Sequence, residues 1–251
     1  EDQNPLERNA KDGDRLLGAF NRPMPHWLDF FCYTMFVDRD GKFQLGMLST
    51  SAFKPLAASM GPMLKEESFH LGTGSNGLRR VIKAGIIPLD MLQKFFNKWV
   101  STAHDLFGVD ASSSAHWSYV WGVKGRWDER KKLEAGIEVD KEVLNEEARG
   151  HYHAEIVAEV AKLNGYLPEG STPLIVPHEN FNRDIGAFKR QRFTIEGTPF
   201  EGSDEEWDAY MDSALPNASD EAQLKEFFKQ EWVANKPMSA RQIASGIGAK
   251  V

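Results

Sequence analysis

The chain has 251 residues, of which 41% are hydrophobic and 27% charged, a composition typical of a globular protein with a sizeable core. Its formal net charge of −7 argues against nucleic acid as the main partner, because phosphate binding favours a basic surface. No run of about 18 uncharged apolar residues is present, so we expect no membrane span. The single cysteine, Cys32, excludes an internal disulfide and fits a reducing compartment, so we expect a cytoplasmic protein.

Helices are expected along most of the first two thirds of the sequence. A short helix should end near Asn21, because two prolines follow closely. Longer apolar helices are predicted near 26–51 and 55–71. We expect the chain to bend between them near Phe53, because a residue that precedes a proline, here Pro55, is pushed out of the helical region.

The second of these long helices carries a carboxylate and an imidazole three residues apart, Glu67 and His70. On a helix such side chains share one face, and this pair is the ligand unit of carboxylate-bridged di-metal bundles. Asp38 lies 15 residues before Phe53 (53 − 38), and Glu67 lies 14 after it (67 − 53). At a rise of about 1.5 Å per residue, the two carboxylates would sit at nearly the same height on antiparallel helices. The spacing therefore predicts one metal ion shared by Asp38, Glu67 and His70.

Other interpretations of these residues stay open. Glu-x-x-His also occurs on helices that bind no metal. The run Asp38-Arg39-Asp40-Gly41 is a turn signal, although a calcium loop is excluded because Met47 occupies the position that requires glutamate. Gly41 and Gly46 interrupt an apolar helical pattern, where they permit close helix approach or a local distortion.

The glycine-rich run 72–77 has the letters of a dinucleotide-binding fingerprint, but it follows a helix where the fingerprint needs a strand. We expect this run to end the helix that carries Glu67 and to turn the chain. The clearest helix follows over 88–107, closed by Gly108. His104, near its carboxyl end, is expected to be an ordinary surface or packing histidine.

Two later segments contain charged or metal-binding residue types. Residues 109–132 are aromatic and basic, which suits either phosphate binding or, as we favour, a solvated helix end. A helix over 139–163 carries Glu147 and His151 four residues apart. This pair is a rival metal site, although an exposed helix face is the commoner outcome for such a pair.

The last third of the sequence is richer in loops. We expect a short strand pair over 192–200, a helix opened by a capping box at Ser203, and a final helix over 220–234. The prediction is therefore two domains, a helical bundle portion over 1–164 and a loop-rich appendage over 165–251.

Six segments, taken in order, resemble the second half of the oxygenase component of the benzoyl-CoA 2,3-epoxidase family: FVDRDGKFQL, SAFKPLA, MLKEESFHL, LQKFFNKWVSTAHDLFG, VKGRW and VPHENFNRDIG. The resemblance runs from about Asp2 to about Pro237. It implies a mainly α, ferritin-like helical bundle of the di-iron oxygenase type, with Asp38, Glu67 and His70 as iron ligands. Family members are longer, and their earlier half supplies another glutamate and another Glu-x-x-His. We therefore expect either a fragment or a second polypeptide that completes the site.

The resemblance also implies an enzyme of aromatic catabolism that uses a di-iron centre to activate dioxygen and epoxidise the ring of a benzoyl-CoA-type thioester. Electrons would come from a separate flavin/iron–sulfur reductase, since no flavin or iron–sulfur motif is visible in this sequence. Glu66 is a candidate for supporting the metal ligands or handling a proton. Two alternatives are a catalytically incomplete ferritin-like half that binds its missing part or a partner, and a ferritin-like metal-binding protein.

Overall fold

The computed structural model describes residues 22–140 and 143–228. The chain divides after Leu215 into two compact units, which we describe separately, and the expected boundary after residue 164 stays a prediction. The helix predicted to end near Asn21 and the end of the helix predicted over 220–234 lie outside the described residues. Within the described ranges, no helix is both long and apolar enough to cross a membrane.

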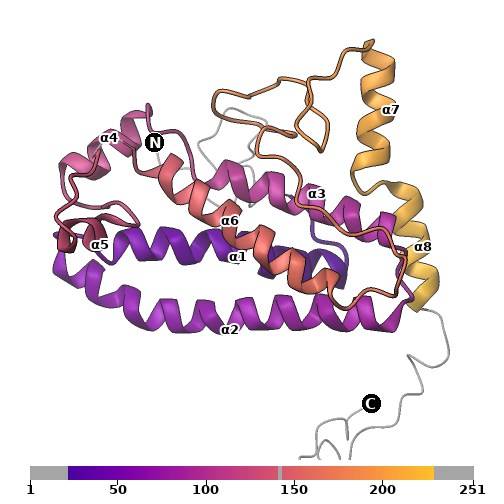
Figure 1. Ribbon diagram of the computed structural model, residues 1–251, viewed down its shortest axis with the longest axis horizontal. Coiled ribbons are helices and arrows are strands. Elements are labelled where there is room, and N and C mark those ends of the chain that lie inside the picture. Colours follow the sequence, from indigo (N-terminus) through magenta and orange to yellow (C-terminus); the bar gives the residue numbers. More distant parts are fainter. Residues whose placement is uncertain (1–21, 141–142, 229–251) are drawn as a thin grey trace, which may run out of the picture. The chain divides into compact units, whose positions relative to one another are not determined.

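Two long antiparallel helices, α1 (Trp27–Leu48) and α2 (Lys54–Ala84), lie side by side along the first unit (Figure 1). The predicted break between them is confirmed, because Phe53 is extended and α2 begins at the Lys54-Pro55 pair. A hydrogen bond of 2.7 Å from the Ala52 amide to the Gly122 carbonyl anchors the connection. The first helix therefore starts one residue later and ends three residues earlier than predicted.

The prediction that the run 72–77 ends α2 is wrong, because the helix continues through it to Ala84. The buried glycines of this run serve close approach to α1. A side chain at Gly74 would meet the backbone of Met35, and one at Gly77 would meet the ring of Phe31. The helix ends instead at Gly85, whose φ of 64° lies in the left-handed region that favours glycine.

The core forms where α1 packs against α3 (Leu89–Leu106) and α6 (Asn145–Asn164). Phe36 of α1 meets Phe96 of α3 with ring centroids 4.9 Å apart, and Phe43 of α1 meets Tyr152 of α6 at 6.2 Å. All four side chains are buried, which makes α1 the helix around which the unit is packed. The predicted 88–107 helix is confirmed to within a residue or two.

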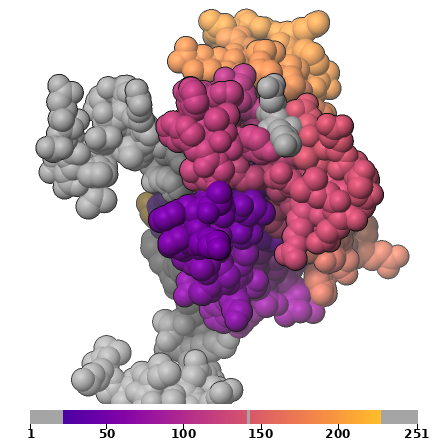
Figure 2. Space-filling model, turned by 90° about the vertical axis from the view of Figure 1, so that its left-hand side faces the viewer, coloured from indigo at the N-terminus to yellow at the C-terminus, as the bar shows by residue number. Residues whose placement is uncertain are grey.

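The helix predicted from residue 139 begins only at Asn145. Its first turn is fixed by Asp110, whose carboxylate accepts hydrogen bonds from the amides of Asn145 (2.7 Å) and Glu146 (2.9 Å). Two shorter helices, α4 (Ser113–Val120) and α5 (Glu129–Glu134), precede it. Figure 2 shows the end of the first unit, where residues 109–135, which include α4 and α5, pack beside α1.

The predicted strand pair over 192–200 is absent, and the described part of the chain contains no strand. A single antiparallel bridge joins Phe193 and Pro199 instead. The turn between them is closed by Gly197, which has a φ of 85° and donates to the Thr194 carbonyl, and the Phe200 amide donates to the Arg192 carbonyl. The capping box at Ser203 is confirmed and opens α7 (Asp204–Ala214). The second unit contains α8 (Ala218–Phe228).

Candidate metal centre

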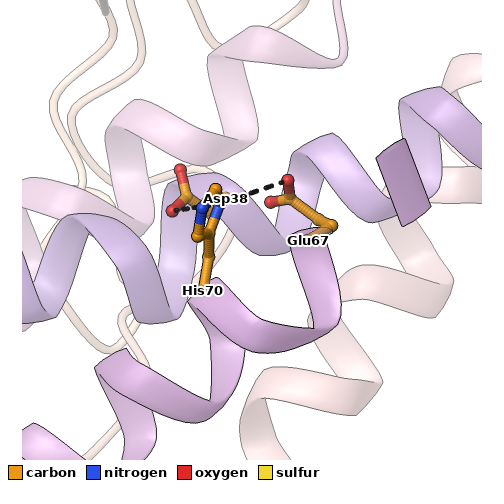
Figure 3. Close-up of side chains that lie close together, drawn as sticks. All are labelled: Asp38, Glu67 and His70. Carbon is orange, nitrogen blue, oxygen red and sulfur yellow. Dashed lines mark ion pairs between the residues drawn. The ribbon is translucent and has the colours of Figure 1, made fainter. Parts of the chain in front are cut away.

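The three residues that sequence spacing predicted as ligands do converge. Asp38 projects from α1, and Glu67 and His70 project from α2 one turn apart (Figure 3). The Nδ1 atom of His70 lies 3.9 Å from a carboxylate oxygen of Asp38 and 3.7 Å from one of Glu67. One possible ligand atom from each residue falls within 4.8 Å of the others. A single ion between the helices can therefore reach all three.

A glycine on α1 makes room for the Glu67 carboxylate. Gly41 lies three residues after Asp38 and so on the same side of α1. A β-carbon at Gly41 would stand 3.2 Å from a carboxylate oxygen of Glu67, closer than most real contacts of that kind. The expected role of this glycine in close helix approach is confirmed, and the helix remains regular around it. Gly46 likewise leaves space for the ring of Trp127.

The carboxylates of Asp38 and Glu67 have too few positively charged neighbours to balance their two negative charges. Both side chains are mostly buried, and in the described ranges their one ion-pair partner is His70, which is half exposed. Burial raises the pKa of Asp38, an effect that His70 partly offsets. Burial and then the charge of Asp38 raise the pKa of Glu67 to about 7. Two buried carboxylates held together without enough countercharge form a site that a cation would stabilise.

Two neighbours that the sequence did not single out face this cluster. Burial raises the pKa of the Tyr33 hydroxyl, and the carboxylates of Asp38 and Glu67 raise it further. Asp40, which looked like part of a turn, is buried within α1 and accepts a hydrogen bond of 3.1 Å from Gln44. Burial raises the pKa of Asp40 to about 7. In the sequence, only the apolar residues on either side of Asp40 indicated that the helix continues through it.

One side of the cluster is open. The side chain of His70 is 51% exposed, and beside it on α2 Phe69 is 76% exposed and Met63 is 43% exposed. Glu66 is also exposed, and within the described part of the chain it forms no ion pair with the three candidate ligands. Its supporting role stays a prediction.

The rival pair Glu147 and His151 belongs to a different kind of cluster. Together with Asp128 these residues also bring ligand atoms within 4.8 Å of one another. Here, however, positively charged side chains of the protein already lie between the carboxylates. Arg126 and Lys132 pair with Asp128 at 2.9 and 2.5 Å, and although burial opposes them, they hold its pKa well below the ordinary range. This cluster is a salt-bridge network, and a metal ion would have to displace two cations.

The basic residues of segment 109–132 divide into two groups: Arg130 and Lys131 are exposed on α5, as the favoured solvated helix end predicts, whereas Lys124 and Arg126 are bound within the protein. The Lys124 amine donates to the side-chain oxygens of Gln44 and Asn145, both at 2.8 Å. His104, expected to be a surface or packing histidine, is completely buried between α3 and α6 and so plays a packing role.

Comparison with known proteins shows which protein family the chain belongs to. The sequence matches the family described as phenylacetic acid catabolic protein over residues 1–179. The chain belongs to this family. Its antiparallel helices agree with the family's ferritin-like helical fold, which confirms the fold predicted from the sequence. The phenylacetic acid catabolic protein match includes both α1 and α2 and therefore all three candidate ligands.

A curated relative is named benzoyl-CoA oxygenase component B, from Aromatoleum evansii. It is 35% identical over an alignment 258 residues long, which covers 86% of this chain and 54% of the relative. The chain thus spans about half the length of the curated relative that it matches. The resemblance recognised from sequence segments is confirmed, and so is its restriction to part of the longer protein.

The donor set fits iron. Carboxylate oxygens and a neutral imidazole nitrogen are the ligands that non-haem iron takes in proteins, and a carboxylate with Glu-x-x-His is half of the set found in di-iron bundles. The described residues provide one such half, Asp38 with Glu67 and His70.

Proposed function

We propose that this chain is part of an oxygen-activating di-iron monooxygenase that epoxidises the aromatic ring of a benzoyl-CoA-type thioester. The observation that carries the proposal is the meeting of Asp38, Glu67 and His70 on α1 and α2, with two mostly buried carboxylates that lack a matching cation. Family membership and the name of the Aromatoleum evansii relative support the choice of substrate and reaction. The reaction would belong to aromatic catabolism in the cytoplasm, where a buried thiol such as Cys32 stays reduced.

Each residue has a distinct task in this proposal. Asp38 and Glu67 bind through carboxylate oxygens, and His70 binds through a neutral imidazole nitrogen. Gly41 allows the Glu67 carboxylate to lie close against α1. Bound iron would supply the activation of dioxygen, which protein side chains do not provide on their own. Packing of α1 against α3 and α6 excludes water from the side of the site that faces the core.

The proposed centre needs ligands from outside the described residues. Three donors are too few for two iron ions, and the canonical set needs a second carboxylate and a second Glu-x-x-His. We propose that two further helices bring these ligands to the open side of the site, beside His70 and Phe69. They would come from the other half of a longer polypeptide or from a second one. A separate flavin/iron–sulfur reductase would deliver electrons, and the word "component" in the relative's name agrees with several parts.

A second candidate function rests on the same incompleteness. The chain would then be a ferritin-like half that binds a partner or holds a metal without oxygenase activity. The exposed apolar residues beside His70 favour this candidate, because Phe69 and Met63 suit a helix-packing surface. The two candidates differ in whether a bound partner creates a two-iron centre.

Elemental analysis of the chain, alone and together with the complementary helices of a relative, tests the proposal. The oxygenase proposal predicts about two iron ions in the complex, and loss of iron in Asp38→Ala and His70→Ala. The matched control is His151→Ala in the salt-bridge network, which should keep its iron. If the complex forms without iron, or if His70→Ala binds as much iron as the unchanged chain, the oxygenase proposal fails.

A further inference from the structure

A second pair of titratable side chains is buried away from the candidate metal centre. His104 of α3 has no exposed surface, and its Nε2 atom lies 3.2 Å from Nδ1 of His153 on α6. The two imidazole rings are 5.3 Å apart, and Tyr152 packs edge-on against His104 at 5.4 Å. These side-chain contacts link α3 to α6, and both helices pack on α1.

The geometry assigns a protonation state to the pair. The other ring nitrogen of His104, Nδ1, is buried and has no hydrogen-bond partner among the described residues. A hydrogen on that atom would be a buried donor left unsatisfied, so we infer that His104 carries its hydrogen on Nε2. That hydrogen is donated to Nδ1 of His153, which must therefore be unprotonated. Both rings are neutral in the packed arrangement.

The charges around the pair oppose protonation of His104. It is faced by Arg149 and His153 from α6, and by Arg183 and His178 from the loop that follows. Burial lowers the pKa of His104 well below its ordinary value, and these groups lower it further.

His153 has a slightly different environment. Burial lowers its pKa, Glu179 raises it, and His178 lowers it. The carboxylate of Glu179 is therefore the one group in this set that favours a charged His153. A proton on Nδ1 of His153 would place N–H against N–H, unless His104 moved its own hydrogen to Nδ1, where it would be a buried donor without a partner among the described residues.

We propose that the His104–His153 pair is an acid-sensitive latch that holds α3 against α6 while both imidazoles are neutral and releases the contact when they take up protons. Release would also affect α1. The Glu155 carboxylate of α6 pairs with two cations of α1, Arg39 and Lys42, which follow Asp38 by one and four residues. The latch therefore links acidification to the support of α1.

The pH window follows from the sign of the shift. An imidazole whose pKa is lowered by folding contributes its full stability above the ordinary histidine pKa of about 6.5. Below that pH the opened state binds protons that the packed state excludes. Each excluded proton then increases the equilibrium constant for opening about tenfold per pH unit, until the pH reaches the lowered pKa.

Denaturant unfolding of the full chain between about pH 8 and about pH 5 tests the latch. The comparison is between the unchanged protein, His104→Leu, and the matched control His151→Gln on the exposed face of α6. Differences between variants cancel the contributions of other titrating groups. We expect the unfolding constant of the unchanged protein, relative to His104→Leu, to rise about tenfold per pH unit below about 6.5. His151→Gln should follow the unchanged protein.

Nitrogen-detected NMR of the imidazole rings in the unchanged protein keeps the test independent of how His104→Leu folds. The latch predicts that the His104 ring stays neutral below about pH 6.5 and changes state only as α3–α6 contacts are lost. Titration of His104 near 6.5 in an intact fold would overturn the proposal, as would equal pH profiles for His104→Leu and the unchanged protein.

Discussion

Replacing Glu67 by glutamine should stabilise the metal-free protein at neutral and alkaline pH while abolishing metal binding. In the metal-free fold the Glu67 carboxylate is mostly buried beside Asp38. Burial, and then the negative charge of Asp38, raise the pKa of Glu67 from 4.5 to about 7. A carboxylate with a raised pKa lowers stability as the pH rises from its unfolded value, here 4.5, through its folded value. Glutamine fills nearly the same space without the charge, so it removes this penalty.

The size of the effect follows from the same shift. At about 1.36 kcal/mol per pH unit, a rise from 4.5 to about 7 corresponds to at most about 3.4 kcal/mol. The site is open beside the half-exposed His70, and water there screens the charge, so we expect about 1–2 kcal/mol. The gain should be absent below about pH 4.5 and complete above about pH 7.

Urea unfolding of chelator-treated protein at about pH 5 and about pH 8 measures this gain. The matched control is Glu66→Gln, which removes the neighbouring exposed carboxylate and should change stability by less than about 0.5 kcal/mol. Added metal should stabilise the unchanged chain by about 2.7 kcal/mol at one hundred times the dissociation constant, and should leave Glu67→Gln unchanged. A metal-free Glu67→Gln variant that is less stable at pH 8, or equally stabilised at both pH values, would refute the reasoning.

Two further substitutions separate the metal site from the packing that supports it. Gly41→Ala should weaken metal binding at least about tenfold, or about 1.4 kcal/mol, because its methyl group would stand 3.2 Å from the Glu67 carboxylate. Isothermal titration with metal measures this loss. The control variant Gly61→Ala, whose methyl group would have nothing within 4 Å, should bind metal normally. Glu155→Gln should destabilise the fold by about 3 kcal/mol in urea unfolding, because it leaves the buried Arg39 unpaired. Glu159→Gln, which breaks a surface pair, should cost under about 1 kcal/mol, and equal effects for these two variants would contradict the assignment.

The candidate site was predictable because its signal is local and periodic. Helical spacing places Glu67 and His70 on one face, and nearly equal distances from Phe53 place Asp38 opposite them. Pro55 fixes where the helices separate, so an error of one or two residues at either helix end does not change the pairing.

Features that depend on distant partners were not predictable. The glycines of the run 72–77 suited a turn as well as a close helix contact, and only the positions of Phe31 and Met35 decide between them. His104 and His153 are 49 residues apart in sequence, and no local pattern relates them. The segment 192–200 pairs at a single bridge, between Phe193 and Pro199, and the local sequence does not show how far such pairing extends.

The most direct test of the central claim is anomalous diffraction from a crystal of the chain loaded with iron or manganese. We predict a metal peak between α1 and α2, bonded to the carboxylates of Asp38 and Glu67 and to the imidazole of His70. No peak there, or a peak at the salt-bridge network of Asp128 and Glu147, would contradict the account.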